Sequence, residues 1–77
     1  MNVNNLIITG YLLSVSDHSF TLLNQEAGSI KIFTNKESLM KIKSYSNIND
    51  NIGVKGHLDA KSGVLQIIAD RISFINK

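Results

Sequence analysis

Apolar residues along the chain gather into five short segments, which are separated by stretches rich in Asn, Ser, Asp and Gly. Within the segments Ile, Leu, Val, Thr, Phe and Tyr predominate, and these residue types favour the pleated surface of a β-sheet. The segments are too short for long amphipathic helices and have the usual length of strands. The pattern predicts five strands, at residues 6–15, 20–23, 29–34, 52–58 and 64–75.

Alternation inside the third and fourth predicted strands separates a core face from an outer face. Lys31 and Phe33 have outward parity in the third strand, and Lys55 and His57 have outward parity in the fourth. The residues predicted to face the core are Ile30, Ile32, Ile52, Val54 and Leu58, together with Phe20 and Phe74. The outer face therefore combines cations with an aromatic ring.

Glycines and a change of parity interrupt the regular strand pattern. Gly10 lies inside the first strand, where a glycine usually marks a bulge or a tight curl at which a sheet closes on itself. Gly53 and Gly56 are expected to bend the fourth strand in the same way. In the last strand the apolar residues change face near Asp70 and Arg71, which predicts a β-bulge there.

The connections between strands predict turns and one helix. The expected turns and hairpin loops are residues 16–19, 24–28 and 59–63, which are rich in Ser, Asn, Asp and Gly. Thr34 and Glu37 have the spacing of a capping box, so a short helix is expected to begin there. Leu39, Ile42 and Tyr45 recur along it at three-residue spacing, which is typical of a helix lying on a sheet.

The predicted order is strand, strand, strand, helix, strand, strand. A chain of 77 residues allows one domain, spanning residues 1–77. Five short strands with one helix between the third and the fourth describe an all-β OB-fold, a five-stranded Greek-key barrel that binds oligonucleotides or oligosaccharides. An SH3-like barrel is the main alternative, but it does not explain the helix after the third strand.

Composition narrows the chemistry available to this domain. The chain has no Cys, which excludes disulfide-stapled folds, Cys-based zinc modules and thiol catalysis. His18 and His57 have no paired carboxylates close to them in the sequence, so we expect no metal and no other cofactor. No nucleophile elbow, phosphate-cradling Gly loop or Ser/His/Asp arrangement is present. The sequence therefore predicts a binding protein and not an enzyme.

Charge and hydropathy limit which environments and partners are compatible with the sequence. A net charge of +2 with a pI of 9.1 is compatible with a polyanion partner without requiring one. Mean hydropathy is +0.04, and the many Ile, Leu and Val residues favour a folded chain over a disordered one. The sequence starts without a basic leader, and its first apolar run is far shorter than the ~20 residues of a membrane span. We expect a cytoplasmic protein without a membrane partner.

Several segments carry recognisable local patterns. Residues 5–12 are an Asn followed by apolar residues and Gly-x-Leu, residues 54–58 read Val-x-Gly-x-Leu, and residues 65–75 are an apolar run, Ala, an acidic residue and an aromatic-aliphatic end. Together with residues 30–33 and the helix at 39–45, these segments resemble the bacterial and phage single-stranded-DNA-binding protein family. The resemblance implies non-sequence-specific binding of single-stranded DNA in replication, recombination or transfer by a small, oligomeric OB-fold protein.

Three departures from that family change what the resemblance implies. The long loops between strands two and three and between strands four and five are trimmed to a few residues, and the family's acidic C-terminal tail is absent. The tryptophans that stack on bases in many members are also missing. We therefore expect weaker binding with a smaller footprint, and no recruitment of partners through a tail.

The resemblance places a stacking aromatic at Phe33, beside Lys31 as a phosphate contact. Each base–aromatic stack contributes roughly 1–3 kcal/mol. Lys55 and His57 face outward from a neighbouring part of the barrel and extend the same surface. Two structural alternatives stay open, in which Phe33 covers the barrel end or an oligomer interface and the lysines are only solvated.

Further candidates lie outside this pair of strands. Tyr11 either stacks on a base or lies in a subunit interface, and the interface is favoured because strand one mediates assembly in the family. Arg71 offers a planar cation to a phosphate or a base, or else forms an ion pair with Asp70. Lys61, in the second hairpin loop, completes the nucleic-acid-binding set. Tyr45 is expected to plug the bottom of the barrel instead of touching nucleic acid.

The predicted partner is single-stranded DNA, with RNA left open because no group is identifiable as a reader of the 2′-hydroxyl. A homo-oligomer, either a dimer or a tetramer, would join several mildly basic surfaces through effective concentration, and replication proteins are further partners. The alternative is an OB-fold protein-interaction module that acts as an accessory subunit of a replication complex. An oligosaccharide-binding domain is a more distant third. The abundance of Asn, Ile and Lys fits a low-GC bacterium, its plasmid or its phage.

Overall fold

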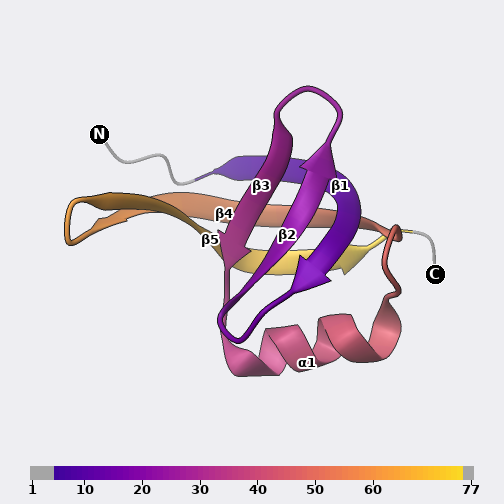
Figure 1. Ribbon diagram of the computed structural model, residues 1–77. Helices are drawn as coiled ribbons and strands as arrows, with labels where there is room; N and C mark the ends of the chain where they lie inside the picture. Colours follow the sequence, from indigo (N-terminus) through magenta and orange to yellow (C-terminus); the bar gives the residue numbers. More distant parts are fainter. Residues whose placement is uncertain (1–4, 76–77) are drawn as a thin grey trace.

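The computed structural model describes residues 5–75, apart from the side chain of Lys61, and contains the predicted order of elements (Figure 1). The elements are β1 (Leu6–Val15), β2 (Ser19–Asn24), β3 (Gly28–Phe33), α1 (Lys36–Tyr45), β4 (Asn51–Lys61) and β5 (Val64–Phe74). All five predicted strands and the helix are confirmed, with small shifts at their ends. No helix in the described part of the chain is long and apolar enough to cross a membrane.

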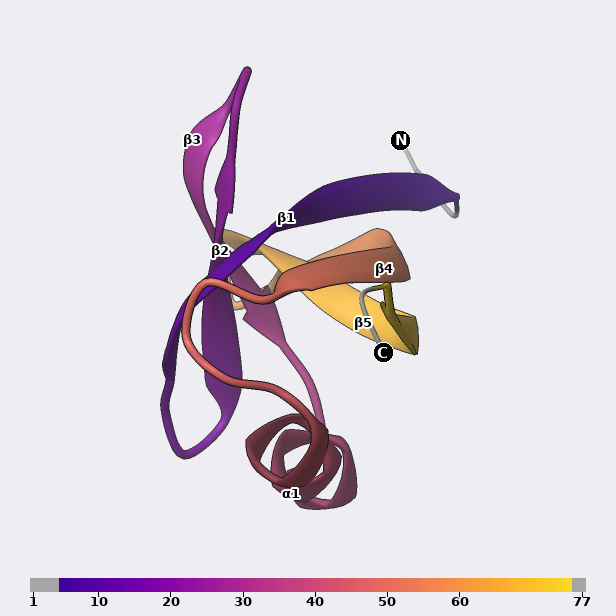
Figure 2. The ribbon, with the colours of Figure 1, turned by 90° about the vertical axis from the view of Figure 1, so that its right-hand side faces the viewer.

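The strands close into a barrel in the order β1, β2, β3, β5, β4, and β4 pairs back onto β1. Neighbouring strands are antiparallel except β3 and β5, which run parallel and pair Ile32 with Ile67 and Phe33 with Ile68. Figure 2, turned by 90°, shows α1 end-on beneath the strands. The predicted five-stranded Greek-key OB-fold is confirmed.

Gly10 lies where β1 changes its pairing partner. The first half of β1 pairs with β4 and the second half pairs with β2. A Cβ atom at Gly10 would lie 2.6 Å from the carbonyl oxygen of Leu23, so only glycine allows β2 to approach so closely. Gly56 plays the same part in β4, where a Cβ would collide with the backbone of Ile68 in β5. Both glycines are therefore required for closure of the barrel.

The β-bulge expected near residues 70 and 71 is present. Lys55 of β4 lies opposite Arg71, whereas the next residue, Gly56, lies opposite Ala69. Asp70 is consequently the extra residue of β5 and has no partner on β4. The bulge explains why the inward-facing apolar residues change parity along β5.

The core fills the inside of the barrel and its lower end. Its fully buried apolar side chains come from β1, β2, β3, β4 and α1, and are Leu12, Phe20, Leu22, Ile32, Leu39, Ile42, Ile52 and Val54. The helix lies across one end of the barrel and contributes Leu39 and Ile42 (Figures 1 and 2). Phe74 and Ile30, also predicted to be inward, are partly buried against this cluster. These inward assignments from strand parity are thereby confirmed, whereas Leu58, also predicted to be inward, is half-buried and lies outside the core cluster.

The start of the helix differs from the predicted capping box. The N-cap residue is Asn35 and not Thr34, because the Asn35 Oδ1 atom accepts a 2.8 Å hydrogen bond from the backbone N–H of Ser38. The backbone N–H of Thr34 donates a hydrogen bond to the carbonyl oxygen of His18, which ties Thr34 to the turn between β1 and β2. Asn is at least as good an N-cap as Thr, so both adjacent residues can cap the helix. The hydrogen bond from Thr34 to His18 favours Asn35 as the cap.

The second hairpin is tighter than the predicted loop at residues 59–63. Its turn consists of Ser62 and Gly63, whose φ angles are +54° and +77°. Two consecutive residues with positive φ form the turn that best matches the twist of two strands. The strands β4 and β5 therefore continue almost to the tip and form a long two-stranded ribbon that projects from the barrel, on the left in Figure 1.

Tyr45 does not plug the barrel as predicted. Its side chain remains 61% exposed, and its ring contacts the edge of the Phe74 ring at a centroid distance of 5.7 Å. Leu39 and Ile42 already fill this end of the barrel, so no space is left for a third large side chain from α1.

Candidate nucleic-acid interface

Three half-buried side chains form a row across the outer face of three adjacent strands. Phe33 of β3 pairs with Ile68 of β5, which in turn pairs with His57 of β4. Paired residues in a sheet point to the same face, and neighbouring strands lie about 4.8 Å apart, so the row is roughly 10 Å wide. The row provides an aromatic ring, an aliphatic side chain and an imidazole side by side.

Lys31 lies next to the Phe33 ring. Its Nζ atom is 5.4 Å from the ring centroid, which is the geometry of a cation–π contact. At an exposed site such a contact contributes only about 0.5–1 kcal/mol, less than a well-formed base stack. An incoming base can therefore displace the ammonium group from the ring, and the ammonium group then remains within reach of a phosphate. The predicted pairing of Phe33 with Lys31 on one face is confirmed.

His57 is held by a carboxylate that the sequence pattern did not place beside it. The Nδ1 atom of His57 lies 2.8 Å and 3.0 Å from the two carboxylate oxygens of Asp70. Asp70 reaches this position because it is the extra residue of the β5 bulge. An ionised carboxylate only accepts, so Nδ1 carries the proton and Nε2 is left for another partner. Asp70 thus contacts His57 instead of forming the ion pair with Arg71 that was one of the alternatives.

Lys55 and Arg71 face each other on the next row of the same surface. They are directly paired across β4 and β5, and both are exposed. Two like charges in opposite positions of an antiparallel pair destabilise the sheet, and a bound anion relieves this repulsion. Ile7 of β1 pairs with Lys55 on the other side and is 79% exposed, which adds apolar surface to the row.

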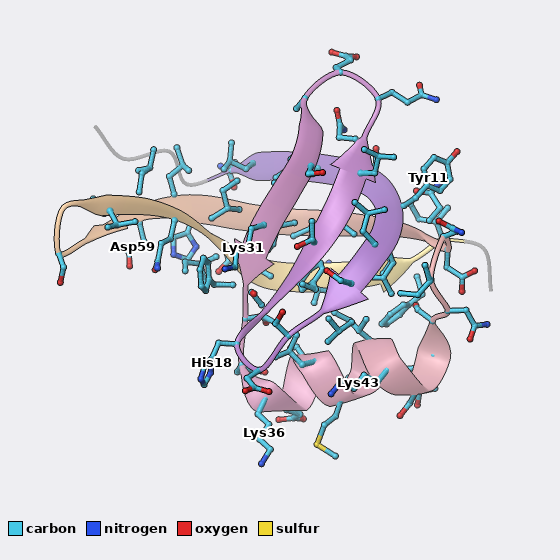
Figure 3. All side chains as sticks on the ribbon, in the orientation of Figure 1. Tyr11, His18, Lys31, Lys36, Lys43 and Asp59 are labelled. Carbon is cyan, nitrogen blue, oxygen red and sulfur yellow. The ribbon has the colours of Figure 1, made fainter. Side chains whose placement is uncertain are left out.

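These residues define one surface, called here the strand face: Lys31, Phe33, Lys55, His57, Ile68 and Arg71. Two carboxylates, Asp59 and Asp70, lie on the same side of β4 and β5, so the strand face is only mildly basic. Figure 3 shows Lys31 and Asp59 on the side of the barrel from which the β4–β5 ribbon projects. A weak, short nucleic-acid contact fits this balance better than a strongly charged track.

Two predicted site residues do not join the strand face. Tyr11 lies at the bend of β1, where it pairs with Leu23 and Asn51, and Figure 3 shows it across the barrel from Lys31. Both Tyr11 and Leu23 are 42% exposed, so they form a separate apolar area. Lys61 is the last residue of β4, and its side chain lies outside the described part of the structure.

Sequence reasoning missed one member of this surface and one contact beside it. Ile68 has outward parity in β5, opposite to that of Leu65 and Ile67, and this signal was available in the sequence. The contact between His57 and Asp70 was not available, because it depends on the register of β4 against β5 around the bulge. Among the described residues, no group of three or more His, Cys, Asp or Glu side chains is arranged to hold a metal ion.

Comparison with solved structures places this architecture among known OB-fold proteins. The mitochondrial single-stranded DNA binding protein Rim1 of S. cerevisiae superposes with a TM-score of 0.76 at 16% sequence identity, over 95% of this chain and 93% of that chain. An OBody, NL8, which was solved bound to hen egg-white lysozyme, gives a TM-score of 0.70 at 19% identity, over 95% and 94% of the two chains. The chain has an OB-fold.

A third neighbour is part of a larger assembly. A chain of a replication protein A heterotrimer bound to single-stranded DNA gives a TM-score of 0.70 at 13% identity, and the match covers 97% of this chain but 60% of that one. No protein-family model matches the sequence. No curated protein matches it either. At these low identities the structural similarity establishes the fold alone.

Proposed function

We propose that this OB-fold protein binds single-stranded DNA without sequence specificity, on the strand face, and catalyses no reaction. The observation that carries the proposal is the Phe33 ring, flanked by the Lys31 ammonium at 5.4 Å and set in a row with Ile68 and His57. Stacking surfaces beside cations are what sequence-independent binding of single strands requires. The facing pair Lys55 and Arg71 supplies two further phosphate contacts.

Each residue of the strand face has a definite part in this proposal. Phe33 stacks on a base, Ile68 packs against the next base or sugar, and the Nε2 atom of His57 contacts a base edge or a phosphate. Lys31, Lys55 and Arg71 neutralise phosphates. Because only a few such groups are present, the footprint is a few nucleotides, and RNA remains an alternative ligand.

Oligomerisation is the second part of the proposal. One copy with a net charge of +2 and a single aromatic ring on the strand face binds weakly, and linked copies raise the overall affinity through effective concentration. The exposed pair Tyr11 and Leu23 lies away from the strand face and is suited to contact another copy in a dimer or tetramer. The similarity to Rim1 and to a chain of the replication protein A heterotrimer supports a role in DNA replication, recombination or transfer.

Fluorescence anisotropy with labelled oligo-dT, duplex DNA and oligo-rU tests the proposal over a salt series. Oligo-dT should bind more tightly than duplex. The slope of log K against log salt should be near −2, since three phosphate contacts contribute about −0.7 each. Phe33→Ala and Phe33→Leu should each lower the affinity about tenfold, because both remove the stacking ring. Phe33→Leu retains apolar volume and separates loss of stacking from loss of folding.

The matched control is Tyr45→Ala, which removes an exposed ring from α1, outside the strand face. It should leave oligo-dT binding unchanged. If folded protein at micromolar concentration and low salt does not bind oligo-dT, or if Phe33→Leu binds as well as the original chain, nucleic-acid binding by the strand face is excluded.

A protein-interaction module is the second candidate function. Exposed apolar side chains along the β4–β5 ribbon, Val64 and Leu65, favour it, as do the small charge excess and the few aromatic residues. The OBody bound to lysozyme supports the idea that such a barrel can bind a protein surface. In this function the chain would act as an accessory subunit of a replication complex.

A further inference from the structure

A hollow of about 310 Å³ lies between α1 and the turn that joins β1 to β2. It is lined by three residues of the turn and four of the helix: Ser16, Asp17, His18, Lys36, Leu39, Met40 and Lys43. We call it the helix hollow. Figure 3 shows His18, Lys36 and Lys43 around the helix, away from Lys31 and Asp59. The helix hollow therefore shares no residue with the strand face.

The helical residues of the hollow form one continuous stripe. Lys36, Met40 and Lys43 are spaced four and three residues apart, which places them on the same side of α1. The two lysines are about 10 Å apart along the helix axis, at a rise of about 1.5 Å per residue. Between them, Leu39 forms a buried apolar floor and Met40, 60% exposed, forms an apolar wall. The stripe thus has a cation at each end and an apolar centre.

Of the two lysines in this stripe, only Lys43, which lies in the last turn of α1, interacts favourably with the helix dipole. Neither Lys36 nor Lys43 forms an ion pair with a carboxylate of the described residues. Lys36 is moreover the first residue of α1, where the helix dipole disfavours a cation, so it does not stabilise the helix that carries it. His18 adds a third nitrogen group, and Asp17 is the one carboxylate that lines the hollow. Because the lining has two lysines and one histidine against one carboxylate, it favours an anionic partner.

We propose that the helix hollow binds an acidic peptide segment of a partner protein, with one aliphatic side chain on Leu39 and Met40 and carboxylates at Lys36 and Lys43. Acidic residues two or four positions apart in an extended peptide are separated by about 7 or 13 Å, which brackets the 10 Å between the lysines. Met adapts its shape to different apolar side chains. No aromatic ring lines the hollow to stack a base, whereas Leu39 and Met40 provide an apolar surface for an aliphatic side chain, so a peptide fits better than nucleic acid.

The test compares two double variants with the same change of charge. Lys36→Glu/Lys43→Glu reverses the helix hollow, and Lys31→Glu/Lys55→Glu reverses the strand face. The probe is a fluorescein-labelled peptide with two Asp residues on each side of a central Leu, and the control peptide replaces Asp by Asn. The first double variant should lower the affinity for the acidic peptide about tenfold, and the second less than about threefold. The affinity for oligo-dT should instead fall more in the second double variant than in the first.

Asp17→Asn gives a test with the opposite sign. It removes the one carboxylate of the hollow and should raise the affinity for the acidic peptide about twofold, an effect that loss of structure cannot imitate. Circular dichroism establishes that each variant is folded.

The proposal is overturned if the original chain binds acidic and Asn peptides equally, or if both double variants weaken peptide binding equally. It is also overturned if Lys36→Glu/Lys43→Glu weakens oligo-dT and not the peptide, because the hollow then belongs to the nucleic-acid path. Failure of oligo-dT binding alone leaves the peptide result standing.

Discussion

The strand face and the helix hollow both combine cations with apolar side chains, but on different supports. In the strand face, Phe33, Ile68 and His57 are fixed by backbone pairing across three strands, so their spacing is set by the sheet. In the helix hollow, Met40 and two lysines extend from a single short helix that is held to the barrel by Leu39 and Ile42. A planar base needs a rigid flat surface, whereas a peptide side chain tolerates an adaptable one. Net charge alone therefore does not indicate which class of ligand a surface binds, and the apolar groups beside the charges have to be considered as well.

The largest expected effect is a loss of stability, caused by a substitution in the core between α1 and the barrel. Ile42→Ala should lower the free energy of unfolding by about 2–5 kcal/mol, because Ile42 is fully buried between α1 and the barrel. Urea denaturation measures this loss. Met40→Ala is the matched control on the same helix and should change stability by less than about 0.5 kcal/mol. Equal destabilisation by the two variants would show that α1 is not anchored by its buried side.

The next effect concerns the helix cap. Asn35→Ala removes the acceptor for the backbone N–H of Ser38 and should cost about 1 kcal/mol of stability. Because the first turn of α1 carries Lys36, peptide binding should weaken, while oligo-dT binding at low temperature should stay unchanged. Thr34→Ala is the control, since Thr34 is not the cap. Thermal unfolding of both variants distinguishes the two positions, and a larger loss for Thr34→Ala would contradict the assignment.

A smaller effect with two opposite signs is expected at Arg71. Arg71→Gln removes one of two facing cations, so the protein should become slightly more stable, by a few tenths of a kcal/mol. The same variant should bind oligo-dT about threefold more weakly, with the salt slope reduced by about 0.7. Lys36→Gln, in the helix hollow, changes the charge equally and should leave oligo-dT binding and the salt slope unchanged. A salt slope unchanged from that of the original chain would remove Arg71 from the strand face.

The smallest effect is expected at Asp70. Asp70→Asn removes a carboxylate from the strand face, so oligo-dT affinity should rise about twofold. Stability should change by less than about 0.5 kcal/mol, because the pair with His57 is partly exposed to solvent. Asp59→Asn, further along β4, is the comparison, and anisotropy measures both. Weaker oligo-dT binding by Asp70→Asn would mean that Asp70 orients His57 instead of opposing the nucleic acid.

Strand parity was sufficient to predict most of the fold. Alternation identified Ile32 and Val54 as inward and Lys31 and Phe33 as outward, and the change of parity near Asp70 identified the bulge. Two of the errors lay where two local solutions are nearly equal in energy. Thr34 and Asn35 are comparable helix caps, and a two-residue turn at Ser62 competes with a longer loop. Tertiary contacts, which are absent from a local reading, decided both.

The candidate site was less predictable than the fold. Phe33 and Lys31 are neighbours in one strand, so their proximity followed from a period of two residues. The contact of His57 with Asp70 and the row through Ile68 required the register of β5 against β3 and β4. The sequence left open whether Tyr11 lies beside the stacking residues, and the bend of β1 at Gly10 decided its position.

The sequence by itself determined which residues form strands, which face each strand buries and that one helix follows the third strand. These properties follow from local periodicity, because every residue of a strand or helix has a fixed direction relative to its neighbours. The tertiary structure alone decided which outer residues come together: Phe33 in a row with Ile68 and His57, and residues of α1 with the β1–β2 turn around the helix hollow. The reason is that barrel closure and strand register bring together segments that are far apart in the chain. Local sequence patterns carry no information about this long-range pairing.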